Sequence, residues 1–255
     1  MLGSSATLTG DVPWRRTFLR RTYTIAGLGI ILSGVIAAGI YRLFGSKGPL
    51  VILEWVQKLP NNFREIALLA AGILILLAMV GLGLVLLKWL ENPSMPLFVL
   101  FIAWIGFASL GGLLLSPVFY IAGFILTLKV FIITGVVFTG TGLLASIIGI
   151  DLTRWGGQLL SILIALTLMG AVNVFIQSEW IELAWLYGGL VIWILVAVYA
   201  HQLLAKLPMP TEEEVEQGAL TRLAIGGALL LYVIFYALFI RLLILALSHQ
   251  GRRRR

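Results

Sequence analysis

Long apolar runs alternate with short polar connections along the whole chain. A helix that crosses the hydrocarbon core of a bilayer needs about 20 consecutive, mostly apolar residues. Seven runs approach or exceed that length: Thr24–Leu43, Ile66–Leu87, Leu97–Leu115, Val118–Ile148, Gly157–Ile176, Ile181–Leu204 and Leu223–Leu247. The pattern predicts an all-α integral membrane protein, a bundle of about seven transmembrane helices.

The third and fourth runs are separated by Ser116 and Pro117 alone. Proline lacks a backbone donor and disfavours helix in the residue before it. We therefore expect a tight helical hairpin there, although the pattern also fits one long kinked helix. The fourth run is longer than a bilayer is thick, which predicts tilting or fraying.

Composition supports the same class. Of the 255 residues, 60% are hydrophobic and 11% charged, whereas soluble domains carry about 25% charged residues. Lipid is thus the expected solvent, in a bacterial cytoplasmic membrane or an organelle membrane. We predict one embedded domain over residues 1–255, with a basic N-terminal segment (1–22), a seven-helix bundle (23–248) and a basic tail (249–255).

The net charge of +7 comes from basic residues that lie at the ends of apolar runs. Anionic lipid and membrane topology explain such positions better than nucleic acid does. Arg15, Arg16, Arg20, Arg21, Lys88, Arg154, Lys206 and Arg222 fall on one set of alternate connections. This bias predicts a cytoplasmic N-terminus, but Lys47, Lys58, Arg64 and the Arg252–Arg255 tail disagree, so the side of the C-terminus stays open.

The sequence holds none of the motifs that would indicate an enzyme. It has no cysteine, no metal-spaced histidines, no phosphate-binding loop and no Ser nucleophile with a base beside it. Glycine pairs such as Gly27/Gly29, Gly81/Gly83 and Gly140/Gly142 lie inside apolar runs, where small residues let helices approach closely. We therefore expect no catalytic activity and no cofactor.

Three ionisable residues lie within the apolar runs, where charge is costly and each is a candidate for function. Lys129 and Arg241 are predicted to be buried cations, and His201 is a candidate proton switch. Arg241 also fits snorkelling to the interface, and His201 also fits an interfacial hydrogen bond. Lys129 fits either a water-lined interior or a contact with a partner or a lipid headgroup. No Asp or Glu lies in any predicted span.

Neutral polar residues supply the other candidates for a pore or gate: Asn173, Tyr199, Gln202 and Tyr232. In lipid, such side chains mostly form hydrogen bonds between helices, which is their alternative role. The acidic stretch Thr211–Glu216 fits the solvated start of a helix better than a cation site.

An ordered set of segments resembles the Bax inhibitor-1 family. The segments are Phe18–Tyr23, Leu115–Phe119, Phe131–Phe138 with Asp151-Leu152, Val172–Phe175, Leu186–Val191 and Tyr199–Leu203. The resemblance implies six helices packed around a seventh and a weak, pH-sensitive calcium leak. Some bacterial relatives are also associated with regulation of a membrane-bound protease.

The resemblance further implies a latch made of two aspartates, on the sixth and seventh helices. Two close carboxylates share a proton, so their charge responds to pH. Here the sixth-helix position falls on Ala200, or on His201 if the register slips by one residue. The seventh-helix positions correspond to Leu230 and Ile234, and Tyr120 lies where a further acid is usual.

Two functions fit these observations. One is a divergent, weak calcium leak that has lost its carboxylate latch. The other is a non-transporting structural or regulatory subunit of a larger membrane protein complex, suggested by the absent acids, Lys129 and the basic tail. The lipid bilayer is the expected partner in both, with other membrane protein subunits in the second.

Overall fold

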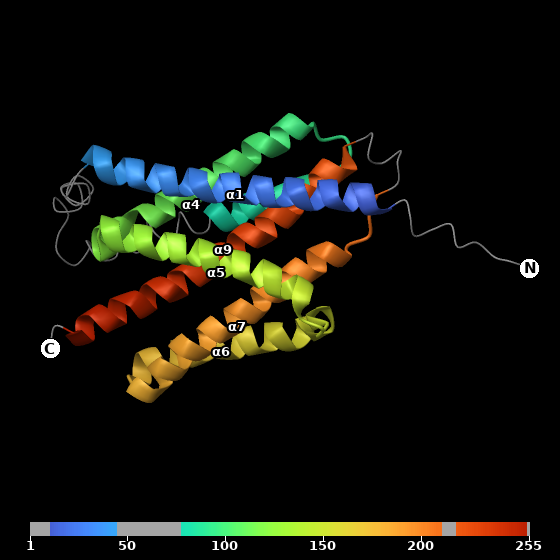
Figure 1. Ribbon diagram of the computed structural model, residues 1–255. Coiled ribbons are helices and arrows are strands. Elements are labelled where there is room, and N and C mark those ends of the chain that lie inside the picture. The colour runs from blue at the N-terminus through green and yellow to red at the C-terminus, as the bar shows by residue number, and fades with distance from the viewer. Residues whose placement is uncertain (1–10, 45–77, 211–217, 254–255) are drawn as a thin grey trace, which may run out of the picture. The chain divides into compact units, whose positions relative to one another are not determined.

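The computed structural model describes residues 11–44, 78–210 and 218–253, and within them it is helical with short connections. The helices are α1 (Asp11–Phe44), α4 (Leu97–Ala122), α5 (Phe124–Ile147), the short 3-10 helix η2 (Leu152–Trp155), α6 (Gly156–Ile176), α7 (Glu179–Lys206) and α9 (Ala219–Arg253) (Figure 1). A shorter apolar helix spans Ala78–Leu90.

Six of these helices are long and apolar enough to cross a membrane, which confirms the predicted class. The predicted second run, Ile66–Leu87, lies mostly outside the described residues, and Ala78–Leu90 is its described part. Helix α1 begins at Asp11, so the later part of the predicted basic segment 1–22 is continuous with the first membrane helix. At the other end α9 is one continuous helix as far as Arg253.

The predicted break between the third and fourth runs is wrong. Pro117 lies inside α4, and the chain turns at Gly123, whose φ of 80° favours glycine. A proline at this position leaves the carbonyl of Leu113 without its usual helical donor. The Ser116 hydroxyl donates to that carbonyl at 2.8 Å, which compensates for the missing bond. The helix therefore continues for another turn.

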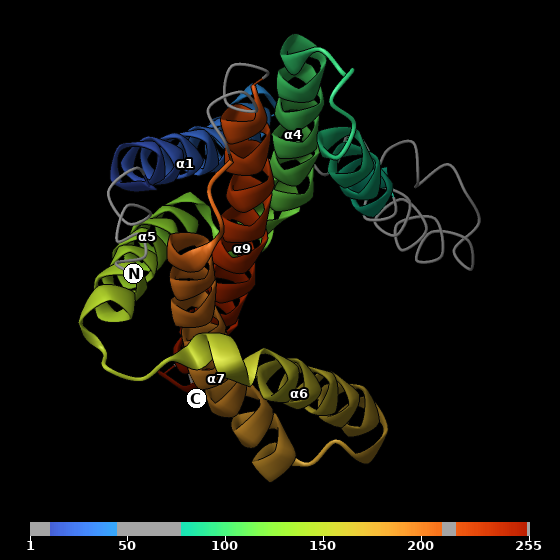
Figure 2. The ribbon, with the colours of Figure 1, turned by 90° about the vertical axis from the view of Figure 1, so that its right-hand side faces the viewer.

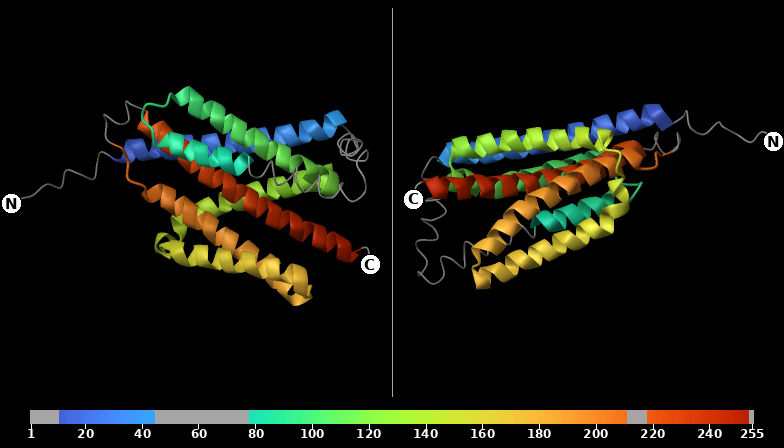
Figure 3. Two further views of the ribbon diagram at one scale, coloured as in Figure 1. Left: turned by 180° about the vertical axis from the view of Figure 1, so that it is seen from behind. Right: turned by 60° about the horizontal axis from the view of Figure 1, so that its bottom comes forward.

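The described residues form two compact units. The first unit contains residues up to 125 and residues 209–229, and the second contains 126–208 and 230–255. In the first unit α1 and α4 lie side by side (Figure 3). In the second, α6 and α7 form an antiparallel hairpin (Figure 2). The single-domain expectation stays a prediction.

Close packing of α1 on α4 depends on glycine. A Cβ at Gly29 would lie 2.6 Å from the Trp104 ring, and one at Gly112 would lie 2.8 Å from the Ser33 carbonyl oxygen. Gly27 has open space around it instead. Residues two apart on a helix face nearly opposite directions, so one glycine of the pair packs and the other faces outward.

Candidate functional site

The candidate residues of α7 lie against the connection between α5 and α6, in the second unit. Gln202 is buried, and its Oε1 accepts a hydrogen bond from the Leu152 amide at 2.8 Å. Its Nε2 donates to the carbonyl of Ile150 at 3.0 Å and to that of Ala145 at 3.4 Å. The side-chain amide thus satisfies backbone groups that no helix pairs.

Asp151 begins η2 and closes the same connection from its polar side. Its carboxylate accepts bonds from the Thr153 amide and hydroxyl, and it pairs with Lys206 at 2.6 Å and with Arg154 at 3.7 Å. The hydrogen bond with Lys206 is the main reason that the pKa of Asp151 falls from 3.8 to about 2. This carboxylate therefore stays ionised at neutral pH, at the end of α7 and outside the spans.

His201 and Tyr199 pack on glycines of neighbouring helices. The His201 ring is buried, faces Gly142 of α5 and lies 5.0 Å from the Phe138 ring centroid. The Tyr199 hydroxyl lies beside Gly156, where a Cβ would be 2.9 Å away. Both contacts resemble tight helix packing more than the lining of a wide channel.

Ala200, Leu230 and Ile234, three of the positions that the family resemblance assigns to the latch, are apolar, and Leu230 is half-buried. Ala200 is fully buried on α7 and Ile234 is 3% exposed on α9. Phe138 of α5 contacts both His201 and Phe235, which ties these two helices to α5. The acids whose side chains the structure describes are Glu91, Asp151, Glu179 and Glu182, and none of them is buried.

Tyr232 is fully buried on α9, and its ring lies 4.7 Å from that of Tyr236. Phe235 and Phe239 extend this aromatic group along the helix, and both meet Phe131 of α5 edge-on. Edge-to-face contacts of this kind stabilise packing beyond the area they bury. Tyr232 is thus part of an aromatic core.

Arg241 is half-buried and anchored on α7. Its guanidinium donates to the Trp185 carbonyl at 2.9 Å, and its central carbon lies 3.8 Å from the centroid of the Trp185 ring. Gly189 leaves the room, since a Cβ there would be 2.6 Å from the guanidinium. A carbonyl and an indole face therefore compensate this cation in place of a carboxylate.

The Lys129 side chain is exposed on α5 and is not covered by neighbouring helices. The predicted run began at Val118 and put Lys129 near mid-span. The observed helix begins at Phe124, so Lys129 lies in its second turn. A flexible lysine side chain can reach the interface from there.

Asn173 closes the hairpin between α6 and α7. Its Oδ1 accepts from the Ser178 amide at 2.9 Å, while its carbonyl accepts from the Gln177 amide at 2.8 Å. Gln177 adopts the left-handed conformation that ends α6. This bonding is typical of a helix terminus, and a pore role for Asn173 stays a prediction.

The sequence indicated only the positive charge of Arg222 and not the contacts that this side chain makes. Arg222 of α9, only 9% exposed, donates to the carbonyls of Asn92 at 3.0 Å, Pro93 at 2.9 Å and Met95. It thereby holds the connection before α4 within the first unit. No local pattern predicts partners about 130 residues away, whereas the Asp-x-Thr-Arg spacing at Asp151 does indicate a capped turn.

Within the described residues, no group of three or more His, Cys, Asp or Glu could hold a metal ion. Polar side chains gather instead around one connection and bind its backbone. The arrangement holds helices in place and presents neutral oxygen and aromatic groups.

Comparison with known proteins assigns the chain to a family. The family model described as inhibitor of apoptosis-promoting Bax1 matches residues 15–252. Curated relatives include the inner membrane protein YbhL of Escherichia coli strain K12 and the protein of the same name from strain O6:H1. Each is 28% identical over 137 residues, which is 54% of this chain and 58% of the relative. Because the family model covers nearly the whole chain, this protein belongs to the Bax inhibitor-1 family of integral membrane proteins.

Proposed function

We propose that the protein is a weak calcium leak of the Bax inhibitor-1 type in which the carboxylate latch has been lost. Family membership over residues 15–252 supports the leak. Loss of the latch is supported by one observation above all: the α7 position that the resemblance assigns when the register does not slip is an alanine, Ala200, and it is fully buried. A methyl group cannot take up a proton, so this position cannot respond to pH.

A leak without carboxylates would be slow. Calcium prefers six to eight oxygen ligands, mostly carboxylate and carbonyl. A calcium path through this chain would rely on backbone carbonyls and hydroxyls. These neutral oxygens attract the ion less strongly than the rings of Asp or Glu side chains that line many cation channels. Arg241 lies on α9 in the second unit, as Ala200 does on α7, and its positive charge would repel a calcium ion that came close.

The proposal is tested by calcium flux into proteoliposomes that contain the full chain. We expect flux above that of empty vesicles, equal at acidic and neutral pH. The informative variant is Ala200→Asp, which restores one carboxylate and should make the flux depend on pH. Leu230→Asp places an acid at a half-buried position and covers the case in which Ala200→Asp does not fold. Absence of flux above empty vesicles at every pH would overturn the proposal.

A second candidate function is a non-transporting structural or regulatory subunit of a membrane complex. The observation that favours it concerns Gln202 and Asn173, the two side-chain amides suggested for a pore. Both already form hydrogen bonds with the backbone of this chain, which is a structural role. Lys129 adds a cation on an exposed face of α5. Gentle extraction followed by amine cross-linking is the test. A lone, monodisperse monomer without cross-linked partners would contradict it.

We assign the protein no enzymatic reaction in either case. The YbhL relatives are described as inner membrane proteins, and we propose a bacterial cytoplasmic membrane for this chain as well. The basic residues at the start of α1 favour a cytoplasmic N-terminus. Protease protection of a tag before residue 11, in inside-out and right-side-out vesicles, tests that orientation.

A further inference from the structure

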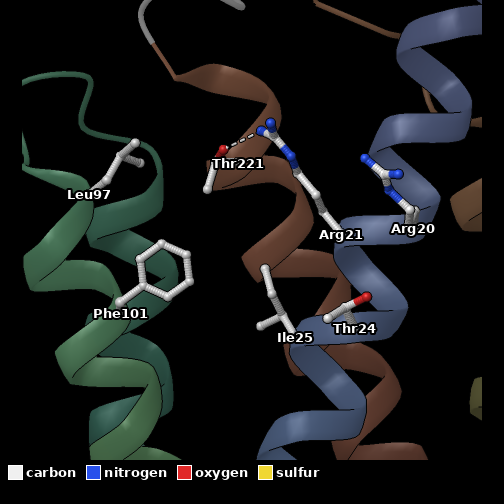
Figure 4. Close-up of a pocket in the computed structure, with 7 residues that line it drawn as sticks. All are labelled: Arg20, Arg21, Thr24, Ile25, Leu97, Phe101 and Thr221. Carbon is white, nitrogen blue, oxygen red and sulfur yellow. Dashed lines mark hydrogen bonds between the residues drawn. The ribbon is translucent and has the colours of Figure 1, made fainter.

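We infer that the first unit binds one anionic phospholipid, in a pocket between the N-terminal part of α1 and the first turns of α4 and α9. The pocket is open, has a volume of about 480 Å³ and is lined by Arg20, Arg21, Thr24, Ile25, Leu97, Phe101 and Thr221 (Figure 4). This inference goes beyond the proposed leak and does not depend on it.

The polar part of the pocket suits a phosphate group. Arg20 and Arg21 are both exposed, and the Arg21 guanidinium donates to the Thr221 hydroxyl at 2.7 Å (Figure 4). A hydroxyl orients the guanidinium without neutralising its charge. In the part of the chain that the structure describes, the ion pairs are those of Asp151, and they involve neither arginine. Guanidinium groups bind phosphate oxygens through two parallel bonds, which gives both affinity and orientation.

The apolar part of the pocket suits an acyl chain. Ile25 lies one turn beyond Arg21 on α1, and Leu97 and Phe101 line the α4 side (Figure 4). Phe101 remains 37% exposed, although it belongs to a helix that otherwise contributes many core residues. A free phosphate ion would gain no binding energy from these apolar side chains. A lipid acyl chain would bury their surface, which is favourable.

The level of the pocket along the helices also fits a headgroup. Trp14 begins the apolar span of α1, and Arg20 and Arg21 lie within its first two turns. Tryptophan and arginine near the start of a span are typical of the headgroup layer. The helices α4 and α9 begin at Leu97 and Ala219, so their positive dipole ends add to the attraction for an anion.

The experiment measures equilibrium binding of phosphatidylglycerol to the full chain in neutral detergent, with phosphatidylcholine of the same acyl chains as the comparison lipid. We expect the wild type to prefer phosphatidylglycerol by about 25-fold, Arg20→Gln and Arg21→Gln each to reduce that preference about fivefold, and the double variant to lose it. Because both side chains are exposed, the double variant should fold.

Arg16→Gln is the matched control. Arg16 is exposed, lies one turn before Arg20 on α1 and does not line the pocket. It removes one positive charge, as Arg20→Gln and Arg21→Gln each do when made singly, and it should leave the lipid preference unchanged because Arg16 does not line the pocket. A loss in Arg16→Gln equal to the loss in Arg20→Gln or Arg21→Gln made singly would mean a diffuse basic surface and would overturn the inference. Displacement of the lipid by millimolar inorganic phosphate would likewise overturn it, because the site would then recognise the anion alone.

Discussion

Gln202 of α7 and Leu152 at the start of η2 are joined by a 2.8 Å hydrogen bond from the Leu152 amide to the Gln202 side-chain carbonyl. The same side chain also binds the carbonyls of Ile150 and Ala145. One glutamine therefore fixes the path of the chain between α5 and α6. Three hydrogen bonds thus engage this buried amide, which the sequence had suggested for a pore.

The first prediction concerns this amide. Gln202→Met keeps the length of the side chain but leaves the Leu152 amide unsatisfied, so we expect a loss of about 1–3 kcal/mol in unfolding free energy. Thermal or denaturant unfolding in detergent measures it. Gln158→Met on the exposed face of α6 is the matched control and should change stability little. Equal stability of the two variants would contradict the structural role of Gln202.

A second prediction concerns acid. The pKa of Asp151 is lowered in the folded state from 3.8 to about 2, chiefly by the Lys206 hydrogen bond. A lowered carboxyl pKa contributes stability that is present above pH 3.8 and is lost as pH falls toward 2. The melting temperature of the wild type should therefore fall more steeply below pH 4 than that of Asp151→Asn. Parallel curves for the two proteins would argue against the ion pair with Lys206.

The third prediction concerns Ser116, which compensates for Pro117. Ser116→Ala should cost roughly 0.6–1.7 kcal/mol while Pro117 is present, because the Leu113 carbonyl then loses its donor. In a Pro117→Ala background the new backbone amide can bond to Leu113, so the same serine substitution should cost much less. A double-mutant cycle on unfolding free energies measures the coupling. A cost that is equal in both backgrounds would contradict this account.

Helix approach in the first unit gives a fourth prediction. A Cβ at Gly112 would lie 2.8 Å from the Ser33 carbonyl and 2.9 Å from the Ile36 Cβ, so Gly112→Ala should destabilise by about 1–3 kcal/mol. Gly27→Ala meets no atom within 4 Å and lies in a helix, where alanine is preferred. It should be neutral or slightly stabilising. The reverse order of stability would mean that α1 and α4 do not pack as described.

The sequence predicted the helical membrane class and most helix positions, because the length of an apolar run depends only on local composition. The family was indicated by the resemblance of the ordered segments from Phe18–Tyr23 to Tyr199–Leu203. The predicted break at Pro117 was wrong because the Ser116 hydroxyl replaces the hydrogen bond that the proline removes, so α4 continues. The depth of Lys129 followed from that error, because its distance from the helix start depends on where the turn falls.

The partners of Gln202 and Arg222 could not be predicted at all. They lie about 50 and about 130 residues away in sequence, and a side-chain bond to a distant carbonyl leaves no local pattern. Residues 45–77 and 211–217 lie outside the described structure, so the predictions that involve Lys47, Lys58 and Arg64 and those for the acidic stretch Thr211–Glu216 stay predictions.

The central claim is that this family member has no titrating carboxylate latch. Calcium flux through proteoliposomes, compared between about pH 5 and about pH 8, tests it most directly, because a shared carboxylate proton would titrate in that range. The account predicts a flux above that of empty vesicles and the same at both pH values. A wild-type flux that rises or falls severalfold between them would contradict the account.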